Sequence, residues 1–83
     1  GSGDQARDFI HIEDCVDAVL ASMDALDPFR PLNLGTGVAT TFRDLARQAC
    51  RVLGHDAAVV NDATKPEGVF WRVGECARMQ AFH

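Results

Sequence analysis

Apolar residues change their spacing along the first third of the chain. Residues 7–12, Arg-Asp-Phe-Ile-His-Ile, alternate between two sides and are rich in strand-forming residues, which predicts a short strand. Glu13 and Asp14 then open a segment whose apolar residues recur at helical spacing, which predicts a helix with an acidic first turn. Proline disfavours helical backbone in the residue before it, so we expect this helix to end at Asp27-Pro28. Its apolar positions are Val16, Val19, Leu20, Met23 and Leu26.

The same alternation of extended and helical patterns recurs in the middle of the chain. Residues 31–34 predict a second short strand, followed by a turn at Gly35-Thr36-Gly37. Thr41-Phe42-Arg43-Asp44 has the spacing of a capping box, in which two side chains satisfy free amide groups at a helix start. Gly54 stands where a C-terminal cap is expected. The helical apolar positions between these caps are Phe42, Leu45, Ala46, Ala49, Val52 and Leu53.

The last third contains weaker extended patterns. Residues 57–60 predict a third strand, residues 61–68 a polar loop and residues 69–73 another extended piece, and the final eight residues begin a helical pattern. Strands that alternate with helices favour an α/β fold with parallel strands joined by right-handed crossovers. We therefore expect a small β-α-β-α-β unit of short parallel strands, a single partial domain over residues 1–83, with part of its sheet uncovered.

Composition and charge narrow the class of protein. The chain has 83 residues, 8 Lys and Arg against 12 Asp and Glu, and a formal net charge of -4, which argues against a nucleic-acid-binding protein with its basic face. No apolar stretch approaches the ~20 residues that a membrane-spanning helix needs. Three widely spaced cysteines without a Cys-x-x-Cys pair indicate neither a disulfide framework nor a zinc site. We expect a cytoplasmic protein without nucleic-acid, membrane or metal partners.

Three segments, in order, resemble the motifs of one enzyme family. They are GSGDQARDFIHIEDCVDAVL at residues 1–20, PLNLGTGVATTFRDLA at residues 31–46 and KPEGVFWRVGECARM at residues 65–79. They are similar to segments of the extended short-chain dehydrogenase/reductases, the NAD-dependent nucleotide-sugar epimerases and dehydratases. The resemblance implies the C-terminal, nucleotide-sugar-binding part of such an enzyme, without its Rossmann half.

The motifs that carry the family's chemistry are absent from these 83 residues. The resemblance implies a catalytic Tyr-x-x-x-Lys and a cofactor turn of the form Gly-x-x-Gly-x-x-Gly, but the chain contains no Tyr and its glycines never take that spacing. Gly35-x-Gly37 lacks the third glycine of a dinucleotide fingerprint, because position 40 is Thr. We expect no cofactor site and no catalysis in this chain alone, while the resemblance implies NAD or NADP for the full-length protein.

Arg7 is the first candidate for substrate binding. A guanidinium group offers two parallel hydrogen bonds to a phosphate, and the resemblance implies that Arg7 contacts the diphosphate of a nucleoside diphosphate sugar. An ion pair with Asp8 or Asp14 is the structural alternative. We expect these two carboxylates to serve as turn and helix-start residues.

Four further residues are candidates for the same site. Asn33 lies in the Asn-x-Gly-x-Gly motif, where it orients the loop or meets the substrate. Thr41 begins a helix whose free amide groups can hold an anion, although capping alone explains a threonine there. The resemblance implies that Lys65 matches a basic position of the third motif that contacts the nucleotide in relatives, and Arg72 follows in the same segment.

Other conspicuous residues have structural explanations. We expect His11 to be a half-buried strand residue rather than a catalyst, and Phe70 and Trp71 to lie in the core, with stacking on a nucleobase as the alternative for an aromatic ring. Three arginines recur every four residues, which predicts a solvated helix face or, alternatively, contact with an acidic partner or with a missing domain. They are Arg43, Arg47 and Arg51.

A second function is also open, that of a self-associating interaction module. An uncovered sheet edge or face favours association, and a two-fold homodimer is the commonest way to close such a surface. The expected contact residues are Met79, Ala81 and Phe82 at the C-terminus.

Overall fold

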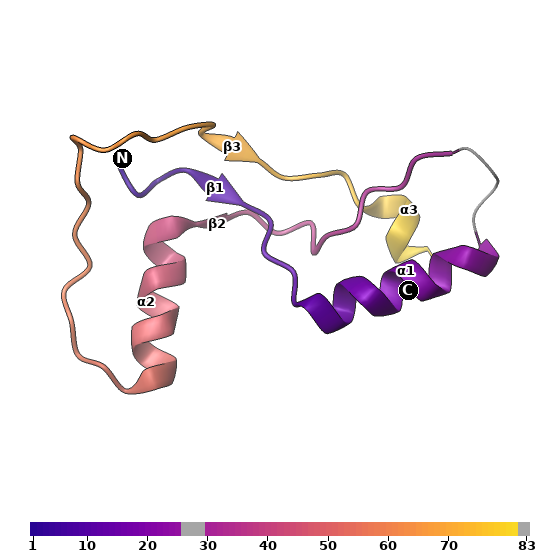
Figure 1. The fold of residues 1–83 in the computed structure, drawn as a ribbon, viewed down its shortest axis with the longest axis horizontal. Coiled ribbons are helices and arrows are strands. Elements are labelled where there is room, and N and C mark those ends of the chain that lie inside the picture. Colours follow the sequence, from indigo (N-terminus) through magenta and orange to yellow (C-terminus); the bar gives the residue numbers. More distant parts are fainter. Residues whose placement is uncertain (26–29, 82–83) are drawn as a thin grey trace. The chain divides into compact units, whose positions relative to one another are not determined.

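The computed structural model describes residues 1–25 and 30–81, and the chain divides into two compact units. Unit 1 comprises residues 1–7 and 39–72, and unit 2 comprises residues 8–38 and 73–83. Strands and helices alternate along the chain, which confirms the predicted α/β class, whereas a single partial domain stays a prediction (Figure 1). The elements are β1 (Ala6–Arg7), α1 (Ile12–Ala25), β2 (Thr40–Thr41), α2 (Phe42–Leu53), β3 (Trp71–Arg72) and α3 (Ala77–Gln80).

Unit 1 contains a three-stranded sheet with the order β2-β1-β3 (Figure 1). β1 and β3 run parallel, as expected, but β1 and β2 run antiparallel, so the sheet is mixed rather than wholly parallel. The reason is that β2 lies at Thr40–Thr41 instead of residues 31–34 and leads directly into α2. The backbone N–H of Phe42 donates to the carbonyl of Gln5, the residue just before β1, at 3.1 Å, which holds the start of α2 against β1.

Local capping fixes both ends of α2. The Thr41 hydroxyl oxygen accepts a hydrogen bond from the Asp44 backbone N–H at 3.1 Å, as the capping-box pattern predicts. At the other end Gly54 is left-handed, with φ of 64°, and its N–H donates to the Arg51 carbonyl at 3.3 Å. Because glycine adopts this conformation at no steric cost, the predicted C-terminal cap is confirmed.

Unit 2 has a small core that joins α1 to α3. Ala18, Cys76 and Met79 are buried, and Leu32 and Leu34 pack against them. This arrangement corrects one expectation. Met79 is only 6% exposed, so it is not available as a dimer contact; Ala81 is exposed, and Phe82 lies outside the described residues.

The apolar residues of α1 that the helical pattern identified do not form this core. Ala18 packs inward, whereas the larger side chains on the other side of the helix are exposed. They are Ile12, Val16, Val19, Leu20 and Met23. Helical periodicity therefore predicted the helix correctly. Within unit 2, however, α1 packs through the side that carries Ala18 and not through the side that carries the larger apolar residues.

The predicted strand at residues 7–12 is mostly not a strand. Only Arg7 belongs to β1, and α1 begins at Ile12, because His11 Nδ1 accepts from the Glu13 backbone N–H at 3.1 Å and the acidic first turn favours a helix N-terminus. His11 is accordingly exposed rather than half-buried. The predicted helix end at residues 27–28 lies outside the described residues.

Two other predicted strands, and the predicted aromatic core, are also wrong. Residues 31–34 and 57–60 form no ladder in the described part of the chain, because a strand exists only where a neighbour pairs with it. Residues 71–72 do pair, but Phe70 and Trp71 are 57% and 59% exposed rather than buried. The predicted C-terminal helix is confirmed at Ala77–Gln80.

Candidate functional site

Two of the five candidate residues, Arg7 and Arg72, lie side by side on the sheet of unit 1. They are register partners across the parallel β1 and β3 strands. Residues paired across a sheet point to the same face, so both guanidinium side chains rise from one face together with Thr40, the partner of Arg7 on β2. Thr41 pairs with Ala6 and therefore belongs to the opposite face.

The Arg7 side chain is half-buried and oriented by two neighbours. Its Nη1 donates to the Ala6 carbonyl oxygen at 2.8 Å, and its guanidinium carbon lies 5.8 Å from the centre of the Phe42 ring. A cation over an aromatic face at this distance is attracted by the ring's quadrupole. The expected alternative, an ion pair of Arg7 with Asp8 or Asp14, is not formed among the described residues.

Arg72 is exposed, and neither Arg7 nor Arg72 has a carboxylate within ion-pair distance in the described part of the chain. Two like charges directly opposite each other in a sheet repel. Most N–H donors of this pair are unused by the protein, since a guanidinium carries five. The arrangement is a small cationic site with unused, fork-shaped donors.

The remaining three candidates do not join this pair. Asn33 belongs to unit 2, where its Nδ2 donates to the Glu75 carbonyl at 3.0 Å, which favours its structural role. Thr41 caps α2. Lys65 is exposed in the loop before β3, and its backbone N–H donates to the Asp62 carbonyl at 3.2 Å.

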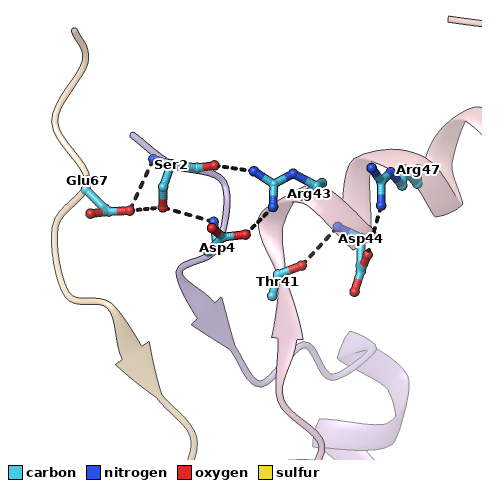
Figure 2. A network of polar contacts seen from close by, with 7 residues as sticks. All are labelled: Ser2, Asp4, Thr41, Arg43, Asp44, Arg47 and Glu67. Atoms are coloured by element: carbon cyan, nitrogen blue, oxygen red, sulfur yellow. Dashed lines mark hydrogen bonds and ion pairs between the residues drawn. The ribbon is translucent and has the colours of Figure 1, made fainter. Parts of the chain in front are cut away.

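A polar network in unit 1 ties the N-terminal segment to α2 and to the loop before β3, as Figure 2 shows. Arg43 forms an ion pair with Asp4 and donates to the Ser2 carbonyl at 2.5 Å. The Ser2 backbone N–H donates to Glu67 Oε1 at 3.1 Å, and the Ser2 hydroxyl donates to the same oxygen. Hydrogen bonds from the Ser2 hydroxyl and backbone lower the pKa of Glu67 below its ordinary value.

A second polar cluster, in unit 2, holds the Gly35-Thr36-Gly37 turn to Asp8. One carboxylate oxygen of Asp8 accepts from the Thr36 N–H at 2.9 Å and from the Thr36 hydroxyl at 2.6 Å, and the other accepts from the Gly37 N–H at 2.8 Å. Desolvation raises the pKa of Asp8, but these hydrogen bonds outweigh it, so the pKa lies below its ordinary value. A Cβ at Gly35 would lie 2.6 Å from Asp8 Oδ2, so only glycine fits.

This cluster decides whether the turn fits a nicotinamide dinucleotide. In a dinucleotide fingerprint the amide groups of the glycine-rich turn face the pyrophosphate. Here the Thr36 and Gly37 amides already donate to Asp8, and its negative charge would repel a phosphate. The described residues at this turn therefore do not fit the group, in agreement with the missing third glycine.

Sequence reasoning assigned Asp8 to a turn without finding its partners, and it missed the contact of Phe42 with Arg7. A usable signal for Asp8 existed, since Gly-Thr-Gly offers two adjacent amides and a hydroxyl to a nearby carboxylate. The sequence held no comparable signal for the contact between Phe42 and Arg7, because helical spacing assigned Phe42 to the core.

Among the described residues no cluster of His, Cys, Asp and Glu could hold a metal ion. None of the described helices has the length and apolar character that crossing a membrane requires.

Comparison with known proteins agrees with the sequence motifs. Residues 1–35 match the model of the NAD dependent epimerase/dehydratase family. The chain is 39% identical over 80 residues to putative GDP-L-fucose synthase 2 of Oryza sativa subsp. japonica, an alignment that covers 96% of the chain and 23% of that protein. It is 40% identical over 68 residues to putative GDP-L-fucose synthase 2 of Arabidopsis thaliana, covering 82% of the chain and 21% of that protein.

A bacterial relative gives the same result. The chain is 38% identical over 77 residues to GDP-L-fucose synthase of Escherichia coli strain K12, which covers 82% of the chain and 24% of that protein. The chain thus spans about a quarter of the length of the curated relatives that it matches. The family-model match over residues 1–35 and the three motifs in order support a segment of a member of the NAD dependent epimerase/dehydratase family.

Proposed function

We propose that this chain contributes the diphosphate-binding residues of a nucleotide-sugar site, with Arg7 and Arg72 as the contacts. The observation that carries the proposal is the pairing of these two arginines in register on one sheet face, without a carboxylate in the described part of the chain to neutralise them. Phosphate oxygens are the natural partners of guanidinium forks, and a diphosphate would relieve the repulsion between the two cations.

The relatives suggest which nucleotide to test. Those named above are called GDP-L-fucose synthases, so a guanosine diphosphate sugar is the substrate class that we propose for the intact protein. In that protein the nicotinamide cofactor supplies hydride transfer, and the role of Arg7 and Arg72 is to hold the diphosphate so that binding energy far from the reacting carbon orients the sugar. The 83 residues alone would bind without catalysing a reaction, in a cytoplasmic protein.

Calorimetric titration of the 83-residue chain with GDP-L-fucose, GDP and GMP tests the proposal. We expect weak binding of the two diphosphates and still weaker binding of GMP, because GMP lacks the second phosphate. Raising the salt concentration should weaken binding, since exposed charge pairs are screened. Arg7→Ala should weaken GDP binding by roughly 5- to 10-fold, or about 1 to 1.4 kcal/mol, in line with the loss of a partly solvated charged hydrogen bond.

Matched variants separate geometry from charge. Arg7→Lys keeps the charge without the fork and should bind GDP with intermediate affinity. Arg78→Ala removes one cation from unit 2, where the Arg78 guanidinium donates to the Pro31 carbonyl at 2.6 Å, and it should leave the affinity unchanged. An affinity that is insensitive to Arg7→Ala and Arg72→Ala, or that falls equally with Arg78→Ala, would contradict the proposed site.

A further inference from the structure

The register of the sheet in unit 1 places Phe42 beside Arg7. Arg7 pairs with Thr40 on β2, and the Phe42 N–H donates to the Gln5 carbonyl at 3.1 Å, which extends this antiparallel pairing by one residue. Phe42 therefore follows two positions after the partner of Arg7 and lies on the same sheet face. Diagonal neighbours of this kind can reach each other when one side chain is aromatic and the other is long.

The two arginines of the candidate site differ in how the protein holds them. The guanidinium carbon of Arg7 lies 5.8 Å from the centre of the Phe42 ring, and Arg7 is half-buried. Phe42 itself is 39% exposed, so its ring lies at the surface of unit 1. Arg72 is exposed and has no such aromatic contact in the described part of the chain. Only Arg7 is therefore held against a ring.

The order of the strands makes two forces on Arg7 act in the same direction. β1 is the central strand, so Arg72 lies on one side of Arg7 and Phe42 on the other. Arg72 repels the Arg7 cation, and the negative face of the Phe42 ring attracts it. The hydrogen bond from Arg7 Nη1 to the Ala6 carbonyl oxygen, at 2.8 Å, is a third restraint. The guanidinium is thus held in place while most of its donors stay available.

We propose that Phe42 is a positioning residue that holds the Arg7 guanidinium ready for a phosphate group. The role rests on the proposed diphosphate site and adds a residue that acts through Arg7 rather than by touching the ligand. A long side chain that must be ordered when a ligand binds lowers the affinity, whereas one that is ordered in advance does not. Arg7 is then the preorganised contact of the site and Arg72 the adaptable one.

Nuclear magnetic resonance of the ligand-free chain tests the contact itself. Nuclei above the face of an aromatic ring are shifted upfield, so the side-chain signals of Arg7 should move downfield in Phe42→Leu. Leucine is the matched replacement because Phe42 also lines a hollow of about 150 Å³ with Val59, and an apolar side chain keeps that hollow filled. Trp71→Leu removes an exposed ring from the opposite sheet face, where Trp71 pairs with Ala6, and should leave the Arg7 signals unchanged.

Calorimetric titration with GDP measures the consequence for binding. Phe42→Leu should weaken GDP binding roughly 2- to 5-fold, less than Arg7→Ala does, because Phe42 orders Arg7 without contacting the ligand. In the Arg7→Ala chain, Phe42→Leu should cause no further loss, a result that a merely structural role of Phe42 would not produce. Trifluorophenylalanine at position 42 keeps the ring but weakens its negative face, so it should weaken binding as Phe42→Leu does, whereas Phe42→Tyr should retain the affinity.

The possible outcomes separate the role of Phe42 from the proposed function. Arg7 signals that Phe42→Leu does not move would overturn the positioning role, and so would an equal loss of GDP affinity with and without Arg7 or an equal loss in Trp71→Leu. Circular dichroism of every variant checks that the helices form. Absence of GDP binding by the unchanged chain would instead contradict the proposed function, and the signals of the ligand-free chain would then still decide whether Phe42 holds Arg7.

Discussion

Asp8 illustrates how one side chain can organise a loop. Its carboxylate accepts three hydrogen bonds from the Thr36 amide, the Thr36 hydroxyl and the Gly37 amide. Without Asp8 these three donors would bind water. Because they bind the carboxylate instead, Asp8 holds the turn in one conformation. Gly35 allows this close approach because it has no Cβ.

We expect Asp8→Asn to destabilise the chain at neutral pH by about 1 to 2 kcal/mol, the lower part of the range for charged hydrogen bonds, because the site is partly solvated. An asparagine has one acceptor oxygen and would place an amide donor opposite an existing donor. Thermal unfolding followed by circular dichroism measures the effect. Asp56→Asn, which removes an exposed carboxylate from the loop after α2, should leave the melting temperature within 1 to 2 °C, which is about what a change of a few tenths of a kcal/mol produces.

The pH dependence of the same variant has a defined sign. The pKa of Asp8 is lowered in the folded state, so its stabilisation is present above the ordinary carboxyl pKa of about 3.9 and is lost as pH falls through the folded value. The stability difference between the unchanged chain and Asp8→Asn should therefore be constant above about pH 5 and shrink below about pH 4. A difference that persists undiminished at pH 2 would show that the carboxylate charge is not responsible.

At the scale of single elements, α2 offers a direct test of a cap. Thr41→Ala removes the oxygen that accepts from the Asp44 N–H and should cost about 1 kcal/mol of stability. Thr41→Ser retains a hydroxyl and should reduce the stability by only a few tenths of a kcal/mol. If Thr41 also held the diphosphate, Thr41→Ala would reduce GDP affinity in the folded chain. We expect GDP affinity to stay unchanged, because Thr41 belongs to the sheet face opposite Arg7 and Arg72.

The elements also show why helices were predicted better than strands. The caps of α2 at Thr41 and Gly54 depend on residues within one turn, so sequence spacing alone locates them. A strand depends on a partner far along the chain: Arg7 pairs with residues 33 and 65 positions away. Residues 57–60 carry a weak extended pattern and residues 69–73 an alternating one, and of these two segments only residues 71–72 pair with β1.

The residues of the candidate site could be predicted from the sequence, but their arrangement could not. Family motifs singled out Arg7 and Arg72 separately, but nothing in the sequence showed that they are register partners. The exposure of the large apolar side chains of α1 was also not predictable, because helical periodicity identifies an apolar face without showing what covers it. In unit 2 the inward-facing residue is Ala18, which periodicity alone does not favour over Leu20.

At the scale of the whole molecule, the chain should distinguish nucleoside diphosphates from nicotinamide dinucleotides. A ligand that binds only the folded state stabilises it by about 2.7 kcal/mol at a concentration of 100 times its dissociation constant. For a chain of this size that corresponds to a melting shift of roughly 10 °C or more. We expect millimolar NAD or NADP to produce no such shift, because the amides of the Gly35-Thr36-Gly37 turn are occupied by Asp8. Thermal unfolding with rising NAD, NADP and GDP makes the comparison. A melting temperature that climbs steadily with NAD would contradict the assignment of this turn, and Asp8→Asn would then show whether the carboxylate competes with the cofactor for the same amides.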